Sequence, residues 1–138
     1  MLTGIDPLLV GPLLAQLDAM GHSDAVVLAD AHFPAARVAT RLLELPGVGT
    51  PALLAAICTV VPQDISDDGA PALDLMDTPD GTRLPVQDEL VAAAGGTEPR
   101  MLDRFAFYDE ARTAFLVVRT GETRTYGNAI LRKGVVHV

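Results

Sequence analysis

The chain has 138 residues, of which 49% are hydrophobic and 20% charged, so it is expected to fold as one globular domain spanning residues 1–138. Its formal net charge of −8 argues against nucleic acid or an anionic membrane as a partner, because both attract basic proteins. The single cysteine, Cys58, excludes an internal disulfide framework and a cysteine-rich zinc site, and it favours a cytoplasmic location.

The N-terminal residues 1–20 predict no signal peptide, because they lack a basic start and carry Asp6 and Asp18 among their leucines. No apolar run is long enough to span a membrane. Only 4% of the residues are aromatic, so the apolar volume comes from alanine, valine and leucine. This composition indicates that some apolar surface is buried between the subunits of a homo-oligomer.

The first half of the chain predicts helices and strands in alternation. Leucines at helical spacing follow Asp6-Pro7 and Pro12, and Gly21 ends that helix. Next comes the apolar run 25–29, which is typical of a strand buried on both faces. A loop is then expected at residues 31–40, a short strand at 41–45, and a helix at 50–61 that ends before Pro62.

The second half continues this alternation. Strands are expected at residues 72–76, 115–119 and 129–131, and helices at residues 86–94 and 109–114. Turn-rich sequences separate them at residues 63–69, 77–85 and 121–122. The pattern predicts the α/β class, as a single domain with a central, mostly buried β-sheet flanked by helices on both faces.

Polar side chains stand at both ends of the predicted strand at residues 25–29. His22 and Asp24 precede it, and Asp30 and His32 follow it. A histidine exchanges protons near neutral pH, and a nearby aspartate can orient its ring. Asp30 lies where a strand leaves the sheet, which is where open α/β sheets place their clefts. His22 is therefore a candidate catalytic residue and Asp30 a candidate binding residue, with Asp24 and His32 as supporting residues.

Each of these residues also has a simpler interpretation. His22 could cap the preceding helix, and both aspartates could accept hydrogen bonds from turn N–H groups. Two histidines and two aspartates are also sufficient ligands for a metal, but no recognised metal spacing is present. We therefore predict no metal and no other cofactor. Cys58 lies on the apolar face of a predicted helix and is interpreted as core packing.

Two further groups lie in the last third of the chain. Arg104 stands beside Phe105, Phe107 and Tyr108, which either form a core cluster or give a sugar an aromatic wall beside a multidentate donor. In Tyr126-Gly127-Asn128 the glycine either serves a turn or lets the backbone and the asparagine amide approach a ligand closely. Neither group decides between its two interpretations alone.

Taken together, these segments resemble the fucose mutarotase and ribose pyranase family. The residues of these segments are most similar to those of the fucose mutarotase branch. Residues 36–99 follow the family least, and residues 64–85 carry no signature. The resemblance lies in Met20-Gly21-His22-x-Asp24, Asp30-Ala31-His32-Phe33-Pro34, Arg104-Phe105-Ala106-Phe107-Tyr108, Arg119-Thr120-Gly121-Glu122, Tyr126-Gly127-Asn128 and Lys133-Gly134-Val135.

The resemblance implies a ribose pyranase-like fold and a role for each matching residue. His22 matches the catalytic acid of the family, Asp30 a substrate-binding carboxylate, and Arg104 a substrate contact. Tyr108 falls where the ribose branch carries a pocket histidine, and Tyr126-Gly127-Asn128 matches the last substrate-binding segment. The family also implies a homo-oligomer, a pentameric ring or a decamer, with pockets near the subunit contacts.

The expected activity is that of a cofactor-independent isomerase, a mutarotase that interconverts the α and β anomers of a free monosaccharide, with L-fucose as the first candidate. Opening and closing the sugar ring needs proton transfers that His22 can perform, with Tyr126 or Tyr108 as a candidate second relay. There are two alternatives. One is a ribose pyranase-type isomerase that interconverts pyranose and furanose rings, and the other is a non-catalytic sugar-binding module on the same scaffold.

Overall fold

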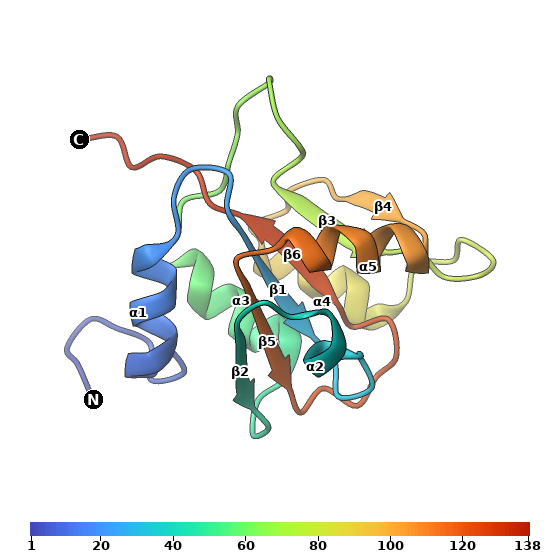
Figure 1. Cartoon of the computed structure of the whole chain (residues 1–138), viewed down its shortest axis with the longest axis horizontal. Coiled ribbons are helices and arrows are strands. Elements are labelled where there is room, and N and C mark those ends of the chain that lie inside the picture. Colours follow the sequence, from blue (N-terminus) through green and yellow to red (C-terminus); the bar gives the residue numbers. More distant parts are fainter.

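The computed structural model describes residues 1–138 as a six-stranded sheet with five helices around it (Figure 1). The helices are α1 (Gly11–Ala19), α2 (Ala35–Val38), α3 (Thr50–Cys58), α4 (Pro85–Ala93) and α5 (Arg104–Thr113). The strands are β1 (Ala25–Ala29), β2 (Leu42–Leu45), β3 (Leu73–Met76), β4 (Arg100–Leu102), β5 (Leu116–Thr120) and β6 (Ala129–Arg132). None of the helices combines the length and the apolar character that crossing a membrane requires.

The sheet has the strand order β2-β5-β1-β6-β3-β4, so β1 lies near its centre. β6 runs antiparallel to both of its neighbours, β1 and β3, and the other neighbouring pairs are parallel. Because β6 is reversed, its start lies beside the end of β1, with Ala129 opposite Leu28. The reversal therefore brings the residues just before β6 next to those just after β1.

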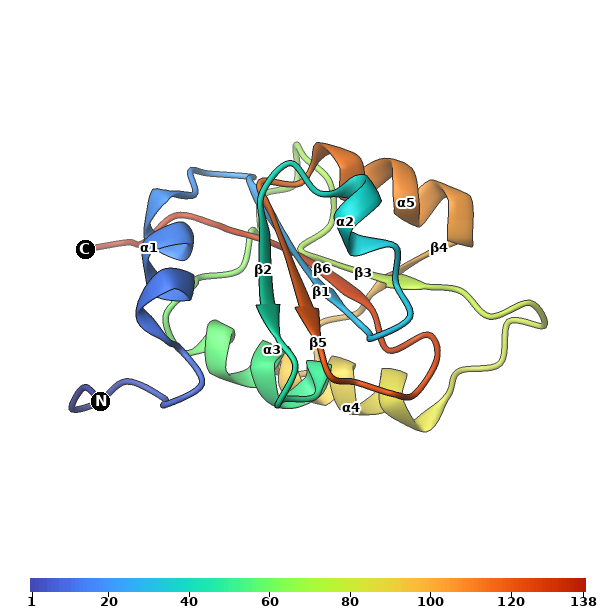
Figure 2. The ribbon, with the colours of Figure 1, turned by 60° about the horizontal axis from the view of Figure 1, so that its bottom comes forward.

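Helices cover both faces of the sheet (Figure 2). On one face α1, α3 and α4 pack apolar side chains such as Leu54 and Leu90 against the strands. On the other face α2 and α5 do the same, with Phe107 of α5 fully buried. Successive residues of β1 point to opposite faces, so Val26 enters the first core and Val27 the second. This arrangement confirms the predicted α/β class with a buried sheet between two layers of helices.

Some predicted boundaries are wrong. Residues 31–40 include the short helix α2, which follows Pro34. The last helix begins at Arg104 and not at residue 109, because the Asp103 carboxylate caps it by accepting hydrogen bonds from two first-turn N–H groups at 3.0 Å. The edge strand β4 was not predicted. α3 ends at Cys58, whose thiol lies half-buried beside the core, and that burial raises its pKa.

A network of charged side chains fixes α5 to the sheet. Asp74 of β3 is fully buried and accepts hydrogen bonds from Arg100 Nε at 2.8 Å and Nη2 at 3.0 Å. Arg132 Nη1 lies 2.8 Å from the same carboxylate, and Arg132 Nη2 donates to Glu110 Oε2 at 3.0 Å. Three strands are thereby joined to the helix that carries Tyr108.

Candidate active site

Asp30 stands directly after β1 and forms a reciprocal pair with Asn128, which stands directly before β6. The Asp30 backbone N–H donates to Asn128 Oδ1 at 2.7 Å, and Asn128 Nδ2 donates to Asp30 Oδ2 at 2.9 Å. The His32 N–H donates to the other carboxylate oxygen at 2.9 Å. Burial raises the pKa of Asp30 above its ordinary value, although these hydrogen bonds act in the opposite direction. The pair is polar and lies where β1 ends and β6 begins, near the middle of the sheet.

A hollow of about 220 Å³ opens beside this pair. Its lining residues come from the segment after β1, from the last residue of β3, from the first half of α5 and from the segment before β6: Asp30, His32, Phe33, Met76, Arg104, Tyr108, Thr125, Tyr126 and Asn128. Six predicted site residues are therefore brought together, although they are scattered along the chain. Polar donors and acceptors in it converge beside aromatic and apolar surface, as is typical of small-molecule sites.

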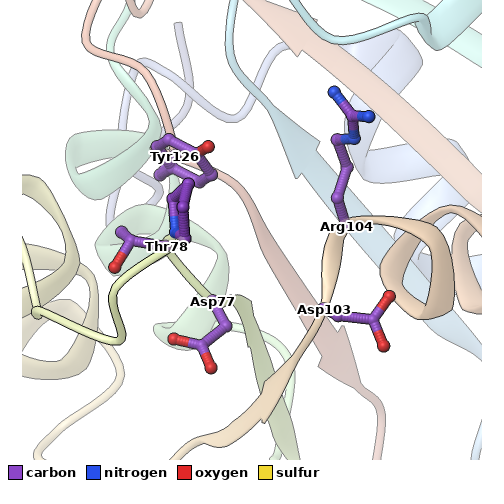
Figure 3. A pocket seen from close by; sticks show the side chains of 6 residues that line it. Asp77, Thr78, Asp103, Arg104 and Tyr126 are labelled. Carbon is purple, nitrogen blue, oxygen red and sulfur yellow. The ribbon is translucent and has the colours of Figure 1, made fainter.

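A second hollow of about 480 Å³ adjoins the first, and the two share Arg104 and Tyr126. Figure 3 shows Asp103 and Arg104 at the start of α5 on one side of this hollow, with Thr78 and Tyr126 opposite them. Asp77, just after β3, supplies a further carboxylate. The two hollows form one polar groove along the end of the sheet at which the inner strands β1 and β3 terminate.

Only part of the expected aromatic wall faces the hollow. Tyr108 lines it together with Phe33, with ring centroids 5.4 Å apart in an edge-to-face arrangement. Phe107 is a core residue. Phe105 is exposed and lies under the Arg104 guanidinium, whose central carbon is 4.7 Å from the ring centroid. The core interpretation therefore applies to Phe107, and the interpretation as a wall of the hollow applies to Tyr108.

Tyr126 has a positive φ of 62°, which is uncommon for a residue with a side chain. The preceding turn holds it: the Arg124 Nε donates to the buried Glu122 Oε1 at 2.9 Å, and this contact lowers the pKa of Glu122. Gly127 does not line either hollow. A side chain there would meet Glu122 Cγ at 2.9 Å and Val86 Cγ2 at 3.2 Å, so its small size serves packing against this turn.

His22 lies at the opposite end of β1 from Asp30. The strand between them has five residues, which at about 3.3 Å per residue separates its ends by roughly 16 Å. His22 lines a third hollow of about 420 Å³, together with residues of the 62–66 loop and of the C-terminal segment, including Asp64 and His137. One chain therefore does not bring His22 and Asp30 to the same ligand.

The neighbours of His22 differ from those predicted. Asp24 does not contact the ring; its Oδ2 accepts a hydrogen bond from the Gly21 N–H at 2.7 Å and closes a turn. The ring Nε2 instead lies 3.3 Å from Oδ1 of Asp64, in the segment that shows no family signature. His22 and Asp24 are also remote from Asp30 and His32, so these four side chains do not gather around one point of the chain.

Several lining residues were not singled out from the sequence. Met76 is the last residue of β3, and Asp77 and Thr78 follow it; the position at the end of a parallel strand is the available signal for them. Asp103 could be found as a helix cap from its place before the 104–113 helix. Asp64 offers no such signal, because its relation to His22 spans 42 positions of sequence.

Comparisons with known proteins agree with this geometry. Residues 3–136 match the model of the RbsD / FucU transport protein family. The chain is 42% identical to the fucose mutarotase of Danio rerio, over 99% of this chain and 95% of that protein. It is 40% identical to an L-fucose mutarotase of Actinobacillus pleuropneumoniae, over 100% and 99% of the two chains.

The fold also matches that of a solved structure. The fucose mutarotase of Streptococcus pneumoniae, crystallised in complex with L-fucose, superimposes with a TM-score of 0.89 at 34% identity, over 99% of this chain and 100% of that one. The agreement extends over the whole sheet and its helices, including residues 36–99, where the sequence resemblance is weakest. The chain belongs to the RbsD / FucU family.

Proposed function

We propose that this protein is a cofactor-independent mutarotase that interconverts the α and β anomers of L-fucose. The observation that carries the proposal is the polar hollow at the end of β1, built from family-matching residues in a chain about 40% identical to L-fucose mutarotases over its full length. A free monosaccharide presents hydroxyl groups around an apolar ring face. The carboxylate, guanidinium, amide and aromatic groups of the hollow suit both.

Each lining residue has a proposed role. Asp30 accepts hydrogen bonds from sugar hydroxyls and Asn128 holds its carboxylate in place. Arg104 donates to ring or hydroxyl oxygens, and Tyr108 packs on the apolar face of the sugar. Tyr126 reaches the sugar from the segment that Gly127 allows to pack closely, and His32 supports the Asp30 carboxylate through its N–H.

The proposed proton donor, His22, must come from a second copy of the chain. His22 and the Asp30 hollow lie at opposite ends of β1, so a complete site needs a contact between copies. Exposed apolar side chains line the His22 hollow: Ile65 is 85% exposed and Val135 is 51% exposed. We propose a pentameric ring or a decamer in the cytoplasm, in which these side chains are covered.

The chemistry needs proton transfer but no cofactor. A proton leaves the anomeric hydroxyl, the bond between C1 and the ring oxygen breaks, and the ring oxygen keeps the electron pair and takes up a proton. The open-chain aldehyde then rotates about C1–C2 and closes on its other face by the reverse steps. The neutral imidazole of His22 can accept one proton and the imidazolium can return one, so the enzyme ends as it began.

Saturation-transfer NMR on an α/β mixture of L-fucose tests the proposal. Catalytic protein should accelerate the exchange between the two anomer signals, and dialysis against a chelator should leave the rate unchanged. A competing function is a non-catalytic sugar-binding module, which is favoured by the fact that one chain forms the Asp30 hollow without His22. Binding of L-fucose with no faster exchange would support the module and contradict the mutarotase.

A further inference from the structure

We propose that Asp64 is the positioning residue of His22: its carboxylate accepts the Nε2 hydrogen, fixes the ring, and leaves Nδ1 as the nitrogen that exchanges protons with the sugar. This inference rests on the proposed function. The contact joins Nε2 of a half-exposed imidazole to a carboxylate that is 2% exposed, at 3.3 Å. The sequence favoured Asp24 for this role, but the Asp24 carboxylate is turned to the N–H of Gly21.

The Asp64 carboxylate is held in its charged form by hydrogen bonds other than the one to His22. Oδ1 accepts from the Ser66 hydroxyl at 2.6 Å and from the Ser66 N–H at 3.1 Å, and Oδ2 accepts from the Ser23 hydroxyl at 2.9 Å. These donors, Ser66 first, keep the pKa of Asp64 well below its ordinary value. An ionised carboxylate only accepts hydrogen bonds, so the ring nitrogen facing it must carry the hydrogen.

The backbone around the pair is fixed from three segments of the chain. The Ser23 N–H donates to the Lys133 carbonyl at 2.8 Å, and the Lys133 N–H donates to the Asp24 backbone carbonyl at 2.9 Å. The Asp64 N–H donates to the Arg132 carbonyl at 3.0 Å. Ser23 also has a positive φ of 68°, which these contacts hold in place. The imidazole and the carboxylate are therefore carried on one preorganised frame at the start of β1 and the end of β6.

The other charged groups nearby do not compete for this role. His137 is the only other ionisable side chain that lines the hollow, and it belongs to the exposed C-terminal segment. Lys133 points its ammonium at backbone carbonyls at the end of α1, at 2.7 and 2.8 Å. Asp64 is thus the single anion in contact with the ring. Paired this way, a carboxylate orients a histidine, selects its tautomer and stabilises its protonated form.

The test compares Asp64→Asn and Asp64→Ala with Asp6→Asn. Asparagine keeps an acceptor oxygen for the Ser66 N–H and the ring but removes the charge, whereas alanine removes both. Asp6 is a matched control, because it accepts the N–H of Leu8 two residues on at 2.9 Å in a similar turn remote from His22. Anomer exchange of L-fucose by NMR at saturating sugar, its pH profile, sugar affinity and thermal melting are measured for each.

We expect Asp64→Asn to lower turnover about 10-fold or more. A general acid or base contributes about 10²–10⁴-fold to the rate, and a misoriented ring loses part of that contribution. The pH profile should differ from that of the parent, because the ring loses the anion beside it, while sugar affinity should change little. Asp64→Ala should lose more turnover, and Asp6→Asn should match the parent. Folded Asp64 variants with the parent turnover and pH profile would overturn the role of Asp64 alone. A parent protein that does not accelerate exchange would overturn the proposed function and this role together.

Discussion

The surroundings of Asp30 and His22 predict different effects of substitution. Asp30 is buried and is proposed to bind the sugar, so Asp30→Asn should weaken L-fucose binding about 10- to 100-fold, equivalent to the roughly 1.5–3 kcal/mol of a charged hydrogen bond. Turnover at saturating sugar should fall less. His22→Ala should do the reverse and lower turnover about 10²–10⁴-fold with little loss of affinity. Calorimetric titration beside the NMR exchange assay separates the two, and equal affinity in Asp30→Asn and the parent would exclude Asp30 from binding.

The raised pKa of Asp30 predicts that L-fucose affinity depends on pH in the acidic range. The Asp30 carboxylate takes up a proton at a higher pH than an ordinary aspartate, whose pKa is about 3.9, so the anion proposed to bind the sugar is lost earlier on acidification. L-fucose affinity of the parent should therefore begin to fall above pH 4, whereas Asp30→Asn should lack this step. Affinity that is level down to pH 4 in the parent would contradict the role of the charged form.

At the scale of secondary-structure elements, the charge network under α5 sets the position of the groove. Asp74→Ala removes the fully buried carboxylate that pairs with both Arg100 and Arg132, and leaves the Arg132 guanidinium, 5% exposed, with Glu110 as its one remaining anionic partner; it should destabilise the fold by about 3–5 kcal/mol. The matched control is Asp109→Ala, which breaks an exposed pair with Arg112 on the same helix and should cost about 0–1 kcal/mol. Urea unfolding measures both, and similar losses in the two variants would show that burial of the network contributes nothing.

The helices and strands differ in how well they could be predicted from the sequence. The apolar run of β1 and the proline-started helix α3 were predicted because burial imposes a clear pattern on their residues. The strand β4 was missed because three partly buried residues at a sheet edge carry too short a pattern, and α2 is a single turn. The groove residues Asp30, Arg104 and Asn128 were identified, since each matches a family segment. The contact of Asp64 with His22 depends on tertiary structure alone.

At the scale of the whole molecule, the proposed mechanism requires an assembly, because His22 and Asp30 lie at opposite ends of β1 within one chain. Sedimentation should show a species far above the 14.5 kDa of the chain. The apolar side chains around the His22 hollow, Ile65 and Val135 among them, should be covered in it. A monomer at micromolar concentration would contradict a site shared between copies.

The central proposal is that His22 of one copy and the Asp30 hollow of another form one catalytic site, and co-assembly of two variants, each impaired in a different half of that site, tests it most directly. His22→Ala and Asp30→Asn chains are co-expressed in equal amounts, and anomer exchange is measured at a low L-fucose concentration. Random assembly should give about a quarter of the sites both native residues, so activity should recover to about that fraction of the parent. A mixed assembly no more active than the two variants measured separately would contradict the shared site.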